Sequence, residues 1–180
     1  MGAYHKRKGF FMEGKISDSI FTSVMVGQLP EAVAWIRGNT EYPNLSGVAM
    51  FFEAPFGGVL VEVEVYGLPE ENVNGFYGLH IHEFGNCTHP FDKTGNHYNP
   101  NNLEHPRHAG DMPPLLGNDG YAWTAFYDER FTMDEIIGRS IVIHDMRDDF
   151  STQPSGDSGT KIGCGEIIRN AQFENRDMRR

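Results

Sequence analysis

Alternation of apolar and polar residues is clearest over residues 59–66. Valine occupies every second position from Val59 to Val65, and the two glutamates of this run, Glu62 and Glu64, fall on the opposite face. Successive side chains of a strand point to opposite faces, so this period of two predicts a half-buried antiparallel strand. Residues 54–58 are rich in turn formers and join it to the apolar run at 47–53, which predicts a hairpin.

The other apolar runs are short and are separated by residues that favour turns. They predict further strands at residues 32–36, 77–83, 121–127, 140–144 and 162–168. The loops at 84–120 and 145–161 are rich in Gly, Asn, Pro and Asp, and loops of this length usually carry function or are disordered. We expect one domain over residues 28–170, between an N-terminal extension at 1–27 and a C-terminal tail at 171–180.

The composition supports an all-β fold and excludes several classes of protein. The 21 glycines and 10 prolines suit many short strands joined by turns. A net charge of -10 argues against a nucleic-acid-binding surface, which needs a stripe of Lys and Arg. No run approaches the roughly 20 apolar residues of a membrane span, and the apolar residues 10–12 are too few for a secretory signal. We therefore expect a cytoplasmic protein with neither nucleic-acid nor membrane partners.

A pair of histidines lies on one predicted strand. His80 and His82 are two residues apart, so both side chains project from the same face and can share one metal ion. Taken alone, such a pair is a weak signal, and histidines that only decorate a surface are the better explanation. His144 directly follows the apolar run 141–143, where a buried strand reaches a loop, and this position suits a ligand that completes a distant site.

A second group of ligand-type residues lies within residues 97–111. Three histidine nitrogens and one carboxylate are the ligand set of a closed tetrahedral zinc site. The residues are His97, His105, His108 and Asp111. A loop that is polar only because it is exposed is the alternative, but it explains Asn and Asp better than it explains histidines at this spacing.

Five motifs resemble, in order, the signatures of the Cu/Zn superoxide dismutase family. They are Gly78–Gly85, Gly95–Pro100, His108–Asp111, Gly138–His144 and Gly163–Gly165. The resemblance covers about residues 30–168. It implies an eight-stranded Greek-key β-sandwich or flattened barrel with long metal-binding and electrostatic loops. It also implies conversion of two superoxide anions and two protons to dioxygen and hydrogen peroxide, with copper and zinc as cofactors.

The resemblance also assigns roles to individual residues. Copper would be held by His80, His82, His97 and His144, and zinc by His97, His105, His108 and Asp111. His97 would bridge the two metals, which imidazole can do through its two nitrogens. It would also act in catalysis, released and protonated when copper is reduced. Asp148 would link a copper-ligand histidine to a zinc-ligand histidine, His80 to His105, and so fix both rings.

Two further features concern the cysteines and one lysine. Two free thiols are the default for a cytosolic chain, but the positions of Cys87 and Cys164 resemble the disulfide of the family, with Cys87 placed as in its bacterial members. Lys161 stands where the family usually has an arginine beside copper, so it is a candidate catalytic residue that attracts the anion. It keeps the charge but lacks the planar guanidinium. The alternative is an ordinary exposed loop lysine.

Other functions and states of assembly stay open. A noncatalytic family member could hold zinc and copper as a buffer or a structural module, although the complete copper set argues against it. A zinc hydrolase would need an open zinc position and a general base, and the four zinc ligands leave no vacancy. The substrate implied is the superoxide anion, and a homodimer is a candidate assembly.

Overall fold

The computed structural model describes residues 27–72 and 74–171. The predicted N-terminal extension and C-terminal tail therefore lie outside the described residues, apart from Gly27 and Ala171. Within the described part the regular secondary structure is almost entirely β, as predicted. Its strands are β1 (Ala32–Gly38), β2 (Ser46–Glu53), β3 (Val59–Tyr66), β4 (Phe76–Tyr77), β5 (Leu79–His82), β6 (Leu115–Leu116), β7 (Tyr121–Asp128), β8 (Ser140–His144) and β9 (Lys161–Arg169).

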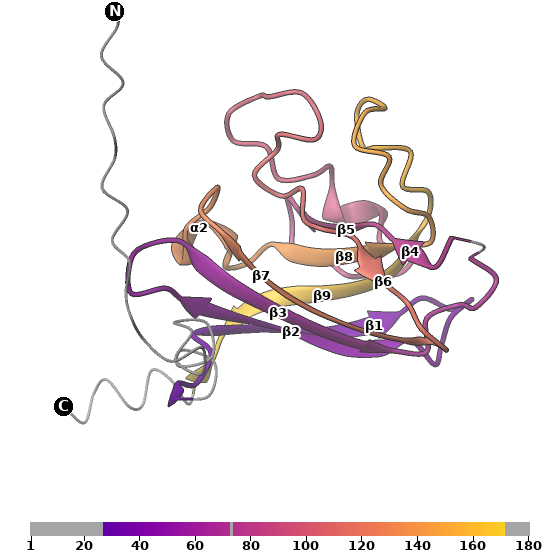
Figure 1. The fold of residues 1–180 in the computed structure, drawn as a ribbon, viewed down its shortest axis with the longest axis horizontal. Helices are drawn as coiled ribbons and strands as arrows, with labels where there is room; N and C mark the ends of the chain where they lie inside the picture. Colours follow the sequence, from indigo (N-terminus) through magenta and orange to yellow (C-terminus); the bar gives the residue numbers. More distant parts are fainter. Residues whose placement is uncertain (1–26, 73, 172–180) are drawn as a thin grey trace, which may run out of the picture.

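Seven of these strands form one antiparallel sheet in the order β5-β8-β9-β1-β2-β3-β7. Figure 1 shows that the sheet is curled, so that β5 and β8 lie over β1, β2 and β3. β5 pairs with β8, and β3 with β7, although other strands intervene along the chain. Such non-consecutive pairing is the mark of Greek-key connections.

β3 carries the alternation predicted from the sequence. Its four valines are at most 1% exposed and face the core, whereas Glu62 and Glu64 are less buried and bond to side chains of the neighbouring strand. The main core cluster joins these valines to apolar residues of β1, β2, β5, β8 and β9. Burial of alternate residues from all these strands holds the curled sheet together.

Residues 77–83 were predicted as one strand, and the structure divides them at Gly78. The Gly78 N–H donates to the Met146 carbonyl, and the Gly78 carbonyl accepts from the His144 N–H. β4 before it pairs with β6, and β5 after it pairs with β8. If β4 and β5 are taken as one interrupted strand, the described residues contain the eight strands that were expected.

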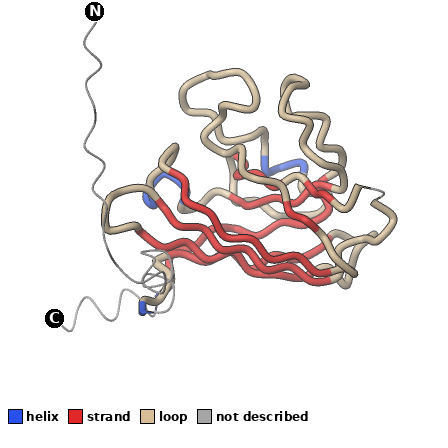
Figure 2. Tube along the Cα trace, in the orientation of Figure 1, coloured by secondary structure: helices blue, strands red, loops and turns tan. Residues whose placement is uncertain are grey.

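Loops and short helices complete the described part of the chain. Apart from Gly27 and Ala171 at its ends, the helical residues of the described part lie in a 3₁₀ turn at Asp92–Thr94 (η1) and in the short α2 (Met133–Ile136), and neither of these two elements has the length or apolarity needed to cross a membrane. Both long predicted loops rise from the sheet on the side where β5 and β8 lie (Figures 1 and 2). The fold thus brings the polar loops over the strands that carry His80, His82 and His144.

Candidate metal centre

The first cluster of ligand-type side chains combines two strands and one loop. β5 supplies His80 and His82, the end of β8 supplies His144, and the loop after η1 supplies His97. Pairing of β5 with β8 and a single bridge between His82 and His97 bring these segments together. One ligand atom from each histidine lies within 4.8 Å of the others, and all four residues are buried.

The second cluster lies entirely in the loop between β5 and β6. It contains His97, His105, His108 and Asp111, again with ligand atoms within 4.8 Å of one another. Nδ1 of His97 is 2.7 Å from Oδ1 of Asp111. Nδ1 of His105 and Nδ1 of His108 lie 3.1 and 3.2 Å from the other carboxylate oxygen. The four donors therefore converge on one point, as a tetrahedral ion requires.

Several buried nitrogens in these clusters are left without hydrogen bonds. Among the described residues, no hydrogen-bond partner exists for His80 Nδ1, His97 Nε2, His105 Nδ1 and His108 Nδ1. Buried polar atoms are normally paired, and each exception needs an explanation. Nε2 of His82 and Nε2 of His144 are 3.3 Å apart, a spacing that one ion about 2.0 Å from each nitrogen can span. The donor sets and these unpaired nitrogens fit two metal ions.

His97 belongs to both clusters. Its Nδ1 faces the carboxylate of Asp111, and its Nε2 is buried with no partner in the described part of the chain. The ring of His97 stacks on that of His80, with centroids 3.8 Å apart. One imidazole thus offers a nitrogen to each cluster, which is the geometry that a bridging ligand needs.

Asp148 links the two clusters by contacting one histidine of each, the His80 and His105 named for it in the sequence analysis. Its Oδ2 is 2.8 Å from Nε2 of His80, and its Oδ1 is 2.8 Å from Nε2 of His105. Accepting both N–H groups leaves the Nδ1 atom of each ring free for an ion. A Cβ at Gly156 would overlap Oδ1 of Asp148, so a larger residue there would displace the carboxylate.

Burial keeps three histidines of the first cluster, His80, His82 and His144, neutral. Desolvation, together with the neighbouring histidines, holds the pKa of His80 and of His82 well below 6.5, and lowers that of His144 to about 3. Burial alone would raise the pKa of Asp111, but the hydrogen bond from His97 and the nearby imidazoles outweigh it and lower the pKa. At neutral pH these three histidines and Asp111 are therefore already in the unprotonated forms that bind metals.

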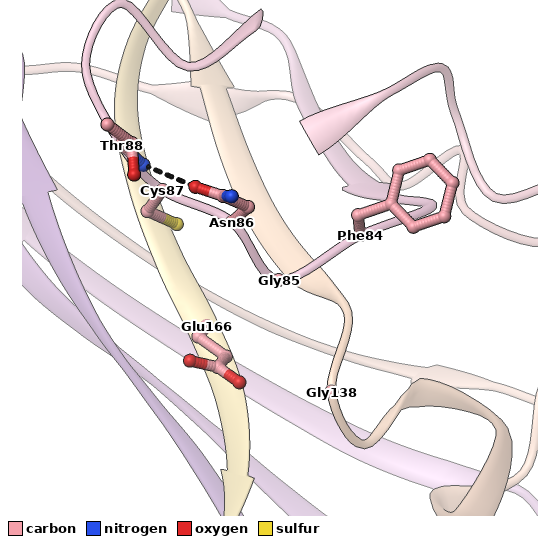
Figure 3. Close-up of a pocket in the computed structure, with 7 residues that line it drawn as sticks. All are labelled: Phe84, Gly85, Asn86, Cys87, Thr88, Gly138 and Glu166. Carbon is pink, nitrogen blue, oxygen red and sulfur yellow. Dashed lines mark hydrogen bonds between the residues drawn. The ribbon is translucent and has the colours of Figure 1, made fainter. Parts of the chain in front are cut away.

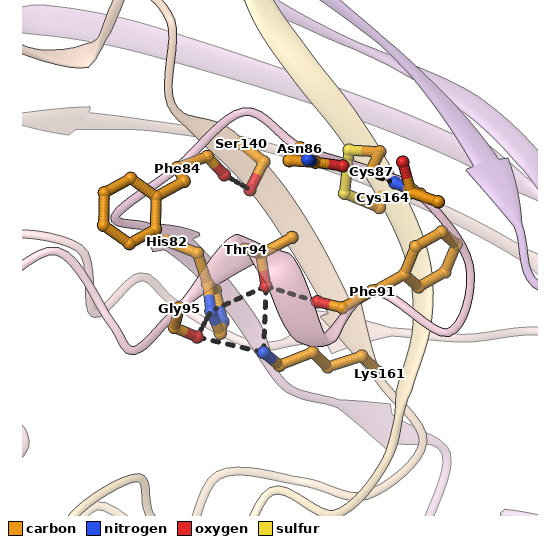
Figure 4. The surroundings of a disulfide bond; sticks show 11 residues. His82, Phe84, Asn86, Cys87, Phe91, Thr94, Gly95, Ser140, Lys161 and Cys164 are labelled. Carbon is orange, nitrogen blue, oxygen red and sulfur yellow. Dashed lines mark hydrogen bonds between the residues drawn. A yellow bond between two sulfur atoms is a disulfide. The ribbon is translucent and has the colours of Figure 1, made fainter.

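Lys161 lies beside the first cluster, at the start of β9. It lines a cleft of about 510 Å³ together with His82, His97, His144 and other residues of the two long loops. Its Nζ donates to Oγ1 of Thr94 at 2.8 Å and to the Gly95 carbonyl at 3.0 Å (Figure 4). The same carbonyl lies 2.9 Å from Nδ1 of His82. Lys161 is thus fixed by two hydrogen bonds and is not a freely solvated loop lysine.

Cys87 and Cys164 form the disulfide that the resemblance implied. The bond joins the loop after β5 to β9 (Figure 4). Phe91 and Val142 pack against it. A separate pocket of about 610 Å³ opens beside the disulfide, with Phe84, Glu166 and Gly138 in its wall (Figure 3). None of the residues that line it belongs to either histidine cluster.

Two residues in direct contact with these loops were not singled out from the sequence. Thr94 accepts the hydrogen bond of Lys161, and Arg130 donates to backbone carbonyls of His108 and Asp111. Both contact partners that are distant in sequence, and Arg130 reaches backbone carbonyls, which every residue possesses, so no local motif marks them. For Thr94, the sequence indicated only that a threonine lies in the loop that carries His97.

Comparison with known proteins bears on the family of this chain. The family model described as copper/zinc superoxide dismutase matches residues 45–167. A superoxide dismutase [Cu-Zn] of Deinococcus radiodurans is 37% identical over 68% of this chain and 76% of its own length. The superoxide dismutase [Cu-Zn] 3 of Arabidopsis thaliana is 34% identical over 76% of this chain and 88% of its own length.

Relatives of a second kind are also found. The human protein named copper chaperone for superoxide dismutase is 30% identical over 89% of this chain, and the pig protein of that name is 32% identical over 79%. This chain spans 62% of the length of the human protein and 54% of the pig protein. These four relatives come from a bacterium, a plant and two mammals, and a bacterial type stays a prediction.

Proposed function

The chain belongs to the copper/zinc superoxide dismutase family, and from this premise we propose that it is itself a superoxide dismutase. The substrate is the superoxide anion, and two anions and two protons give dioxygen and hydrogen peroxide. One observation carries the proposal: two buried ligand clusters share His97 beside an open cleft. A site that only stores metal needs neither the shared imidazole nor the cleft.

The residues divide the work between two metals. Copper, when bound, supplies the one-electron oxidation and reduction, because zinc has a single accessible oxidation state. His80, His82, His97 and His144 would hold copper, and His97, His105, His108 and Asp111 would hold zinc. His97 would carry a proton on Nε2 when that nitrogen is released, while Nδ1 stays in the second cluster. Asp148 keeps His80 and His105 oriented throughout.

A second candidate is suggested by the mammalian relatives, whose printed names describe a copper chaperone for superoxide dismutase. On this alternative the chain would give copper to another protein and would not turn over superoxide. The complete set of four copper-type donors favours the enzyme, since a chain that only hands copper on has no need of the shared histidine. A third function, hydrolysis by a zinc-bound water, is disfavoured because the four donors of the second cluster leave no open position on the zinc ion.

Metal loading and superoxide consumption test this proposal directly. The purified full-length chain should take up one copper and one zinc, and should consume superoxide catalytically only after copper is added. Elemental analysis of the loaded protein and rapid-mixing kinetics provide the two measurements. Full zinc occupancy without activity after copper loading would refute the enzyme, and transfer of copper to a metal-free superoxide dismutase in the same preparation would support the chaperone.

Lys161 has a defined part in this proposal. An ammonium group carries three N–H donors, and two of them are used by Thr94 and the Gly95 carbonyl. One donor and the charge remain available to an anion that enters the cleft. Because the chain carries a net charge of -10, long-range attraction of superoxide is unfavourable. A local positive charge within the screening length of about 8 Å therefore matters more.

Substitutions of Lys161 should change the rate without changing the metal content. We expect Lys161→Ala to slow the second-order reaction with superoxide several-fold and to weaken its dependence on ionic strength, and Lys161→Glu to slow it more. Lys161→Arg should retain or raise the rate, because the charge is kept and donors are added. Rate constants at low and high salt provide the measurement. Ala and Glu variants indistinguishable from the parent at low salt would remove Lys161 from the site.

A further inference from the structure

Arg130 contacts the backbone of the second cluster. It lies in the turn between β7 and α2, outside the loop that carries the four donors. Its Nη1 donates to the His108 carbonyl at 3.1 Å, and its Nη2 donates to the Asp111 carbonyl. One guanidinium therefore holds the backbone of two of the four donor residues.

Asp128 holds the guanidinium in place. This residue is the last of β7 and is 6% exposed, and its backbone is in register with Val59 of β3. Nε of Arg130 lies 3.0 and 3.2 Å from the two carboxylate oxygens, and Nη2 lies 2.5 Å from Oδ2. A planar guanidinium paired in this way has a fixed orientation. Arg130 thus links the end of β7 to the loop that carries the second cluster.

The pair also suits a position close to a metal cation. A lone positive charge beside Zn²⁺ would disfavour binding of the ion, but the negative charge of Asp128 compensates the positive charge of Arg130. With its charge compensated, Arg130 acts on the cluster through two oriented N–H donors, which bind the carbonyls of His108 and Asp111. The loop itself adds a short turn, in which the His108 N–H donates to Oδ2 of Asp111 at 3.0 Å and the Asp111 N–H donates to the His108 carbonyl at 3.3 Å.

We propose that Arg130, held by Asp128, is a positioning residue for zinc, which fixes His108 and Asp111 in their binding geometry before the ion arrives. This inference rests on the proposed use of the second cluster as a zinc site. A ligand loop that is already ordered loses less conformational entropy on binding, so the affinity rises. Partners that orient metal ligands typically contribute about 10–100-fold to affinity.

Zinc affinity of full-length variants tests the proposal without any measurement of activity. Competition with a zinc-chelating dye should show that Arg130→Gln binds zinc about 10–100-fold more weakly than the parent. Arg130→Lys should recover only part of the loss, because one ammonium cannot hold two carbonyls and a carboxylate together. Arg107→Gln is the matched control, since it removes one charge from an exposed residue of the same loop and should bind within about twofold of the parent.

A spectroscopic measurement separates positioning from general stability. Cobalt(II) in place of zinc should give Arg130→Gln a visible absorption band that differs in position or intensity from the parent's, whereas Arg107→Gln should keep the parent's band. Should Arg130→Gln fail to fold, Arg130→Lys and Asp128→Asn carry the same comparison. Parent-like affinity and spectrum in these variants would overturn the inference. Absence of zinc binding by the parent would instead overturn the proposed function.

Discussion

Replacing His82 with alanine should abolish copper-dependent consumption of superoxide while most zinc is retained. His82 belongs to the first cluster and not to the second. Loss of a residue that hydrogen-bonds to a metal ligand costs about 10–100-fold in metal affinity or activity, so loss of a direct ligand should cost more than about 100-fold. Elemental analysis of the purified variant, together with rates measured at saturating copper, gives both quantities from one preparation.

His108→Ala is the reciprocal control, because His108 belongs to the second cluster alone. It should lose zinc and keep copper, and its activity should fall less than that of His82→Ala. His97→Ala should impair both metals, since His97 is shared. If His82→Ala loses both metals to the same extent, the division of ligands proposed here is wrong.

Removal of the disulfide should produce the largest loss of stability. Cys87 and Cys164 are 77 residues apart, and a closed loop of this length restricts the unfolded chain by about 4.5 kcal/mol in the chain-entropy model. We expect the Cys87→Ser/Cys164→Ser double variant of the metal-free protein to lose roughly 2–5 kcal/mol in its free energy of unfolding. Urea denaturation followed by circular dichroism measures this difference.

Metal should mask part of that loss, because an ion that binds only the folded state stabilises it. The zinc-loaded double variant is therefore expected to unfold at a higher urea concentration than the metal-free double variant. Alkylation of the native parent without reductant should find no free thiol. Two alkylatable thiols in native protein, or an unfolding free energy equal to that of the double variant, would contradict the prediction.

Local pattern was sufficient for the long strands and insufficient where the chain changes partners. The valines of β3 predicted both the strand and its buried face, because a period of two depends only on neighbours in sequence. The division at Gly78 depends on hydrogen bonds to residues 144 and 146, which no local pattern contains. α2 could have been found, since Thr132 and Glu135 form a capping box with the spacing that marks helix starts.

The candidate site shows the same division. Histidines and an aspartate at characteristic spacing were recognisable as ligands, because few other roles bring such residues together. Lys161 was placed beside the first cluster by resemblance, but its fixation by Thr94 was not foreseen. Arg130 and Thr94 act on partners distant in sequence, and residue type alone does not reveal which carbonyl or amine a side chain will reach.

The two clusters also differ in how much of the chain must fold before each is complete. Donors of the second lie close together, with His97 and Asp111 separated by 14 residues, whereas His82 and His144 of the first are separated by 62. The entropic cost of closing a loop grows with the logarithm of its length, so bringing His82 to His144 costs about 1 kcal/mol more than bringing His97 to Asp111. A growing chain contains the entire second set before β8 exists. Zinc-type coordination can therefore assemble early, and the copper-type site forms only once β8 has paired with β5.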